Sequence, residues 1–111
     1  MTEGQMQSQC FIWFWNTYPE HRRMLLHVDN NSFNSIEGNR KKAMGVVRGV
    51  SDFILILPSM VMFIELKLPT GKQSEEQVDF QNKVVSKGHP YTIIRSFEQF
   101  KNLIWQVIGK R

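Results

Sequence analysis

Three charged side chains, Asp52, Glu65 and Lys67, stand at the ends of two otherwise apolar segments of this 111-residue chain. The segments read DFILIL and MVMFIELK, and only Pro58 and Ser59 separate them. A tight turn at this point predicts a β-hairpin in which Asp52 lies directly opposite Glu65. Because side chains alternate along a strand, Lys67 is expected on the same face as both carboxylates.

Two carboxylates placed opposite each other destabilise a sheet unless something neutralises them, because their Cβ atoms are only ~4.5–5.5 Å apart. A divalent cation would neutralise both. Mg²⁺ takes oxygen ligands at about 2.1 Å and commonly uses one or two carboxylates together with waters. The pattern therefore predicts a Mg²⁺ or Mn²⁺ site held by Asp52 and Glu65, with the backbone carbonyl of Leu66 as a further ligand.

The ammonium group of Lys67 could orient a metal-bound water or stabilise negative charge that builds up on a phosphate. The same residues also fit a structural ion pair at the rim of the sheet, between Lys67 and one of the two carboxylates. The bare spacing D…ExK is compatible with both interpretations.

The remaining sequence predicts one α/β domain over residues 1–111, because a hairpin that is apolar on both faces needs helices above and below it. Capping patterns at Thr2, Ser74 and Ser96 predict three helices, the first reaching about residue 18 and the second residue 87. Two further strands are expected at residues 24–28 and 91–95, with an asparagine-rich loop after the first. The glycine-rich segment 37–51 predicts a mobile loop with a turn of helix at residues 40–44.

The stretch GVVRGVSDFILI followed by FIELKLPTGKQSEEQ resembles the core of the virus-type replication-repair nuclease (VRR-NUC) domain, a branch of the PD-(D/E)XK nuclease superfamily. That family shows a glycine-rich segment before the aspartate, a hydrophobic strand, E-x-K, a short loop with glycine, and S-x-x-Q at a helix start. The matching positions here are Gly45 to Gly49, Asp52, Glu65 to Lys67, Gly71, and Ser74 with Gln77.

The resemblance extends to GHPYTIIRSFEQF, which is similar to the family's last strand and helix, and to TEGQMQ, which is similar to its first helix. Residues 16–42 have no counterpart in the pattern. Ser51 stands where the family usually has proline. Proline would stiffen the start of the strand but coordinates nothing, so serine leaves the metal chemistry possible.

The resemblance implies a restriction-endonuclease-like core, a small mixed sheet between helices, and a Mg²⁺- or Mn²⁺-dependent enzyme that hydrolyses phosphodiester bonds of DNA. It implies that Asp52 and Glu65 bind the metal and that Lys67 is the catalytic lysine. It adds Gln77 as an accessory active-site residue and Glu3 as an acid from the first helix that reaches the metal. Both also have structural interpretations, because glutamine completes a capping box and glutamate favours a first helical turn. A nucleic-acid-binding module with an inactive metal site is the alternative function.

Basic residues favour a nucleic-acid partner. Lysine and arginine outnumber aspartate and glutamate 14 to 10, which gives a net charge of +4, although a small excess of lysine also aids solubility. Five basic residues lie close in sequence to the acidic site, and we expect them to contact DNA phosphates rather than bases: Arg40, Lys41, Lys42, Arg48 and Lys72. A solvated charge run is the alternative for each of them.

The sequence favours a soluble cytoplasmic protein. The single cysteine, Cys10, excludes an internal disulfide framework and fits a reducing compartment. No apolar run approaches the ~18 residues of a membrane span, and the first residues lack the features of a signal peptide. The spacing of the three histidines does not suggest a zinc site.

The segment CFIWFW is apolar on every side of the first helix, so this helix is either buried on several sides or meets another chain. VRR-NUC proteins of viral and bacterial type are associated with homodimers that act on four-way DNA junctions. The resemblance therefore implies a homodimer on branched DNA, with Trp13 or Trp15 offered to the second copy. Packing of these residues within one domain is the alternative.

Overall fold

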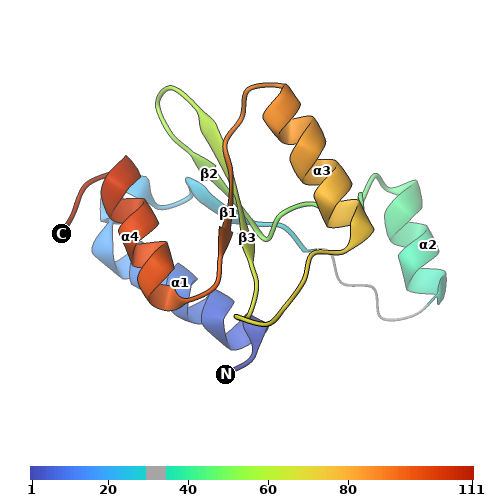
Figure 1. The fold of residues 1–111 in the computed structure, drawn as a ribbon, viewed down its shortest axis with the longest axis horizontal. Coiled ribbons are helices and arrows are strands. Elements are labelled where there is room, and N and C mark those ends of the chain that lie inside the picture. The colour runs from blue at the N-terminus through green and yellow to red at the C-terminus, as the bar shows by residue number, and fades with distance from the viewer. Residues whose placement is uncertain (30–34) are drawn as a thin grey trace.

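The computed structural model describes residues 1–29 and 35–111. The asparagine-rich loop expected after the first strand falls largely on residues 30–34 and so lies outside the described residues. The elements follow one another as shown in Figure 1: α1 (Glu3–Thr17), η1 (Pro19–His21), β1 (Leu25–His27), α2 (Ser35–Ala43), β2 (Phe53–Ile56), β3 (Val61–Leu66), α3 (Glu75–Ser86), β4 (Tyr91–Ile94) and α4 (Phe97–Val107). Among the described residues, no helix is long and apolar enough to cross a membrane.

The four strands form one mixed sheet in the order β1-β2-β3-β4. β2 and β3 are antiparallel in the predicted register, with Phe53 opposite Ile64, and the N–H of Leu57 donates to the carbonyl of Met60 across the two-residue turn (2.9 Å). β4 runs parallel to β3, and α3 forms the crossover that a parallel pair requires. The hairpin and the mixed α/β architecture are therefore confirmed.

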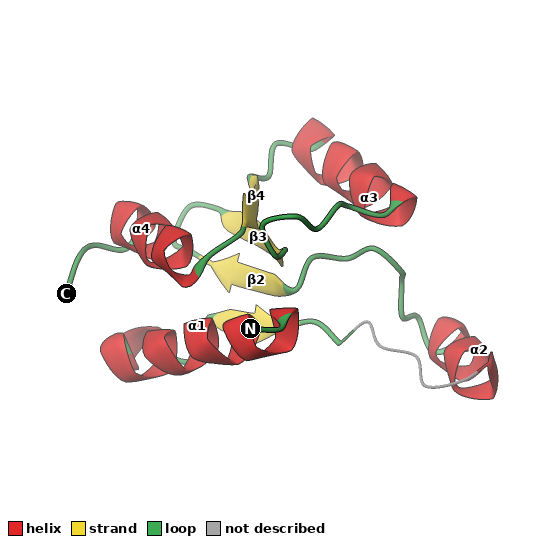
Figure 2. Ribbon diagram, turned by 60° about the horizontal axis from the view of Figure 1, so that its bottom comes forward, coloured by secondary structure: helices red, strands yellow, loops and turns green. Residues whose placement is uncertain are grey.

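Helices cover the two faces of the sheet unequally (Figure 2). α1 and α4 cover one face, where a single apolar core includes Cys10, Phe14, Phe53, Ile64, Phe100 and Ile104. The other face carries α3, whose Phe80 packs edge-on against Phe63 of β3 with ring centroids 5.5 Å apart. Alternation along β3 puts Glu65 on this second face, so the predicted site lies on the α3 side of the sheet.

The expectation of a mobile loop before β2 is wrong in part, because α2 is a helix of nine residues. The glycine that suggested a loop ends this helix: the N–H groups of Gly45 and Val46 donate to the carbonyls of Lys42 and Lys41 at 3.0 and 2.9 Å. Gly45 has φ of 96°, the left-handed conformation that this helix ending requires. The basic residues in the last turn also suit the negative end of the helix dipole.

Gly49 fixes the segment that leads into β2. Its φ is 82°, and a Cβ at this position would lie only 2.5 Å from the backbone carbonyl atoms of Glu76 in α3. Only glycine allows such a close approach. The contact holds residues 48–52 against the first turn of α3, and so places Asp52 beside Gln77.

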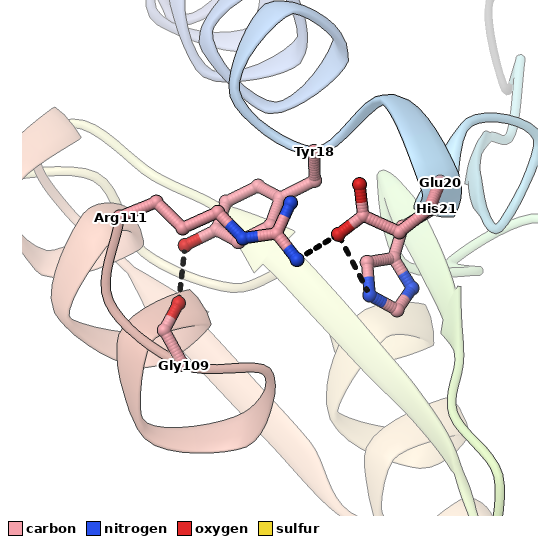
Figure 3. Close-up of polar contacts among 5 residues, drawn as sticks. All are labelled: Tyr18, Glu20, His21, Gly109 and Arg111. Atoms are coloured by element: carbon pink, nitrogen blue, oxygen red, sulfur yellow. Dashed lines mark hydrogen bonds and ion pairs between the residues drawn. The ribbon is translucent and has the colours of Figure 1, made fainter.

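The far end of α1 is closed by a cluster that we call the C-terminal clasp, made of Tyr18, Glu20, His21, Gly109 and Arg111 (Figure 3). The buried Tyr18 hydroxyl donates to the carbonyl of Gly109 at 2.7 Å. The guanidinium of Arg111 lies 4.9 Å from the centre of the Tyr18 ring and pairs with Glu20. The clasp ties the end of α1 to the segment that follows α4.

Candidate metal centre

Asp52 comes directly before β2, at the end of the hairpin away from its turn. Its Oδ2 accepts a hydrogen bond of 2.6 Å from the backbone N–H of Leu66. The N–H and C=O of one strand residue point to the same side of the strand, so the carbonyl of Leu66 also faces the β2 side, where Asp52 lies. A carboxylate and a main-chain carbonyl thus share one edge of β3, as the sequence predicts.

Glu65 is fully buried, with 0% of its surface exposed. Its Oε1 accepts hydrogen bonds from Nε2 of Gln73 (3.0 Å) and from the hydroxyl of Tyr91. Its Oε2 is equally buried and has no hydrogen-bond partner. A buried carboxylate oxygen without a partner is costly, so this atom indicates a missing positively charged or hydrogen-bonding partner.

Lys67 is half-buried on β3's continuation and forms no ion pair with Asp52 or Glu65, all three being described residues. Its stem lies beside Gly71, where an added Cβ would be 3.5 Å from Cδ of Lys67. The structural ion pair that the sequence left open is therefore not formed. Burial raises the pKa of the Asp52 carboxyl, and the ammonium group of Lys67 lies near enough to oppose part of this rise.

A cavity of about 300 Å³ opens beside Asp52. It brings together four residues that the sequence singled out, Glu3 from α1, Arg48, Asp52 and Gln77 from α3. Its remaining lining residues are Gly49, Val50, Ser74 and Glu76. Glu65 and Lys67 are not among them, so Asp52 is the member of the D…ExK pattern that lines the cavity.

The net shift of the pKa of Asp52 is upward, and burial is the largest cause. The hydrogen bond from Leu66 opposes this shift, whereas the charges of Glu3 and Glu65 add to it. Glu3 and Glu65 therefore lie close enough to Asp52 to disfavour its negative charge, an effect that a bound cation would relieve.

Gln77 serves the structural role considered for it and keeps a second group free. The side-chain Oε1 of Gln77 accepts a hydrogen bond from the backbone N–H of Ser74 (2.8 Å), and the backbone N–H of Gln77 donates to Oγ of Ser74 (3.2 Å). These two bonds complete a capping box. No hydrogen bond from its side-chain Nε2 is formed within the described residues. This N–H₂ group can therefore donate to a molecule in the cavity.

The predicted DNA-binding residues fall into three places. Arg48 lines the cavity, and the exposed Lys72 lies in the loop between β3 and α3. Arg40 and Lys42 are exposed on α2, which stands apart from the sheet in both views (Figures 1 and 2). Lys41 differs, because its side chain is only 20% exposed and pairs with Asp29 at 3.8 Å.

Sequence reasoning missed three residues around Glu65: Gln73, Gln81 and Tyr91. Gln73 donates to Oε1 of Gln81 (2.8 Å) as well as to Glu65. Burial and Glu65 raise the pKa of Tyr91 far above its usual value. The parallel pairing of β3 with β4, which sets Tyr91 beside Phe63, would have been the signal, but strand order is not readable from local spacing.

Cys10 is completely buried, and this burial raises the pKa of its thiol to about 12. Such a thiol is not a nucleophile at neutral pH, in agreement with its apolar position in the sequence.

The helix surface expected to meet a second copy is partly used within the protein. Trp13 packs edge-on against four aromatic residues of α1, α4 and their flanks, Tyr18, Phe97, Phe100 and Trp105. Trp13 is thus partly buried within the protein, and the offer of Trp13 or Trp15 to a second copy stays a prediction. Trp15 and Ile12 remain 39% and 57% exposed.

The oxygen set fits Mg²⁺ or Mn²⁺. Carboxylate and carbonyl oxygens are the ligands that these ions prefer, and Oε2 of Glu65 needs a partner. No group of three or more His, Cys, Asp or Glu side chains in the described part of the chain is arranged to hold one metal ion. The side chains that could hold such an ion are Asp52 and Glu65, and Glu3 lines the cavity beside Asp52.

No family model matches the chain, and no curated protein matches it in sequence. Among solved structures, a protein described as a "VRR_NUC domain protein" superposes with a TM-score of 0.80. The match covers 99% of this chain and 95% of that one, at 17% sequence identity. The chain has the fold of a VRR-NUC domain. The resemblance seen in the sequence motifs is thus confirmed for the fold.

Proposed function

We propose that this protein is a Mg²⁺- or Mn²⁺-dependent DNA endonuclease. One observation carries the proposal: a fully buried glutamate, Glu65, keeps one oxygen without a partner next to a second carboxylate, Asp52. A buried carboxylate without a counter-charge carries a desolvation cost, so the stability of the fold does not explain Glu65. The VRR-NUC fold supports the choice of phosphodiester hydrolysis over other uses of a divalent ion.

Asp52, Oε2 of Glu65 and the carbonyl of Leu66 would hold the ion. When bound, it would lower the pKa of a coordinated water and neutralise charge on the scissile phosphate. Lys67, unpaired with either carboxylate, would place its ammonium charge near the attacked phosphate. The free Nε2 of Gln77 would donate to a phosphate oxygen in the cavity.

Arg48 would anchor the DNA backbone at the cavity, because it lines the same space as Asp52. Arg40 and Lys42 on α2 and Lys72 beyond β3 would extend this positive track on two sides. These contacts are to phosphates and carry no sequence information. The proposed enzyme therefore recognises DNA by shape and charge.

We further propose that the endonuclease acts as a homodimer on branched DNA such as four-way junctions. Its support is the VRR-NUC fold, with which such assemblies are associated, and the exposed apolar side chains of Trp15 and Ile12 on α1. Light scattering at micromolar concentration tests the dimer. A monomer mass with and without DNA would defeat it and leave the single-site nuclease standing.

The main test incubates the purified protein with labelled linear, nicked, single-stranded and four-way-junction DNA, in Mg²⁺, Mn²⁺ or EDTA. Metal-dependent cleavage that Asp52→Asn removes is the expected result. Binding of the same DNAs without cleavage in either metal would favour the alternative, a nucleic-acid-binding module with an inactive centre.

A further inference from the structure

We infer that Tyr91 and Gln73, held in place by Gln81 and Phe80, are positioning residues that fix Glu65 as a metal ligand; this inference rests on the proposed metal centre. None of these side chains belongs to the D…ExK pattern. They come from three separate parts of the chain, namely β4, the loop before α3, and α3 itself.

Only one of the two carboxylate oxygens of Glu65 is occupied by hydrogen bonds. Tyr91 and Gln73 both donate to Oε1 of Glu65, and neither contacts Oε2, which has no partner. Two donors that converge on one oxygen fix the plane of the carboxylate. They leave the second oxygen as the only one that can bind an ion without breaking an existing hydrogen bond.

The two side chains that donate to Glu65 carry no positive charge. A buried carboxylate is usually neutralised by a basic side chain, yet both donors here are neutral groups. Glu65 has no salt bridge to any described lysine, arginine or histidine. The negative charge is therefore solvated by dipoles and remains available to a cation, whereas a lysine or arginine in place of Tyr91 would compete with the metal.

The two donors to Glu65 are themselves held in place by neighbouring side chains. Gln73 also donates to Oε1 of Gln81 (2.8 Å), so a second residue on α3 fixes the orientation of its amide. Phe80 packs against both Phe63 and Tyr91, with ring centroids 5.5 and 6.2 Å away. Each donor to Glu65 is thus held by its own neighbour, which is the arrangement that orients ligands around metal ions.

The test measures binding of Mn²⁺ by calorimetry for wild type, Tyr91→Phe and Gln73→Met. Both substitutions keep most of the volume of the side chain and remove one donor to Glu65. We expect each to raise the dissociation constant for Mn²⁺ about tenfold, the lower end of the effect of outer-shell residues. DNA cleavage by both variants should recover when the Mn²⁺ concentration is raised by the same factor.

Tyr18→Phe is the matched control, because it removes a buried tyrosine hydroxyl that donates to a main-chain carbonyl in the clasp. It should lower the thermal midpoint but leave Mn²⁺ binding as in wild type. Wild-type Mn²⁺ affinity in Tyr91→Phe and Gln73→Met, with binding lost in Asp52→Asn, would overturn this inference alone. A wild-type protein that binds no Mn²⁺ would overturn both this inference and the proposed metal centre.

Discussion

Helix α1 connects two regions in which a glutamate is paired in opposite ways. Near its start, Glu3 lines the cavity beside Asp52. The buried Glu65, which follows the strand residue opposite Phe53 and so lies across the hairpin from Asp52, accepts only from neutral groups and keeps one oxygen without a partner. Near its end, in the clasp, the exposed Glu20 pairs with a full positive charge on Arg111 (Figure 3). Both carboxylates have polar partners, but only that of Glu20 has a positively charged one.

The difference separates a structural charge from a functional one. An exposed ion pair such as Glu20 with Arg111 changes the free energy of unfolding little. It therefore needs no role beyond the folded structure. A buried carboxylate without a counter-charge carries a large desolvation cost, which folding does not explain. The region that is unfavourable by itself is therefore the one that a bound cation would stabilise, as proposed above.

The largest expected effect follows from replacing the two proposed ligands. Asp52→Asn and Glu65→Gln should each reduce cleavage by more than about 100-fold, the upper range for residues that only support a ligand. Both replacements keep an oxygen that accepts the existing hydrogen bonds. Glu20→Gln is the matched control and should cleave at the wild-type rate in the same gel assay.

The stability of the same variants should change in the unusual direction. In EDTA, Asp52→Asn and Glu65→Gln should unfold at the wild-type temperature or above it, because each removes one of two carboxylate charges, half-buried at Asp52 and fully buried at Glu65, that repel each other. For Asp52 this agrees with the upward shift of its pKa by burial. A clear loss of thermal midpoint in both variants would place Glu65 in the same structural class as Glu20.

Lys67→Ala should act on turnover and not on the metal. We expect kcat to fall about 10²–10³-fold, as for the loss of one electrostatic stabiliser, while Mn²⁺ still binds with nearly wild-type affinity. Calorimetry and single-turnover cleavage measure the two quantities separately. If Mn²⁺ binding disappears with the lysine, its role is to support the carboxylates and not to stabilise the reacting phosphate.

Much of this site could be predicted because it depends on local rules. The turn at Pro58 and Ser59 and the alternation along β3 put Asp52 across from the Glu65 end of the hairpin, and the strand register confirms this arrangement. The cap at Ser74 likewise placed Gln77 in the first turn of α3.

The parts that could not be predicted depend on how distant elements meet. Tyr91 reaches Glu65 only because β4 lies parallel to β3, and nothing near Tyr91 in the sequence encodes that choice. The length of α2 is underestimated for a different reason: the glycine-rich segment predicts a loop with only a turn of helix at residues 40–44, although a glycine after a basic segment is also the usual end of a helix.

Phosphate binding by α2 is expected to have a moderate effect. Arg40 and Lys42 are exposed, whereas Lys41 is paired with Asp29. Replacing Arg40 and Lys42 by Ala should therefore weaken binding of duplexes of every sequence and reduce the slope of log affinity against log salt by about 1.8, near 0.9 per phosphate contact. Lys41→Ala, the comparison variant, should change the slope less. An unchanged slope in the double variant would direct attention to Arg48 and Lys72.

The smallest expected effect concerns the clasp. The hydrogen bond from Arg111 is the largest of the causes that lower the pKa of Glu20 from 4.5 to about 2. A carboxyl with a lowered pKa adds stability that is present above its unfolded pKa and is lost as the pH falls through the folded one. The thermal midpoint of wild type should therefore exceed that of Glu20→Gln slightly at neutral pH, and this difference should disappear between pH 4.5 and about 2.

Arg111→Gln provides the reciprocal test, because removal of either partner removes the same interaction. Its midpoint should show the same dependence on pH as that of Glu20→Gln, and both differences should shrink at about 1 M salt, where the Debye length is only ~3 Å. A difference from wild type that persists unchanged at acidic pH would mean that Glu20 acts through packing in the clasp. Its charge would then have no part in stability, and the contrast with Glu65 would rest on burial alone.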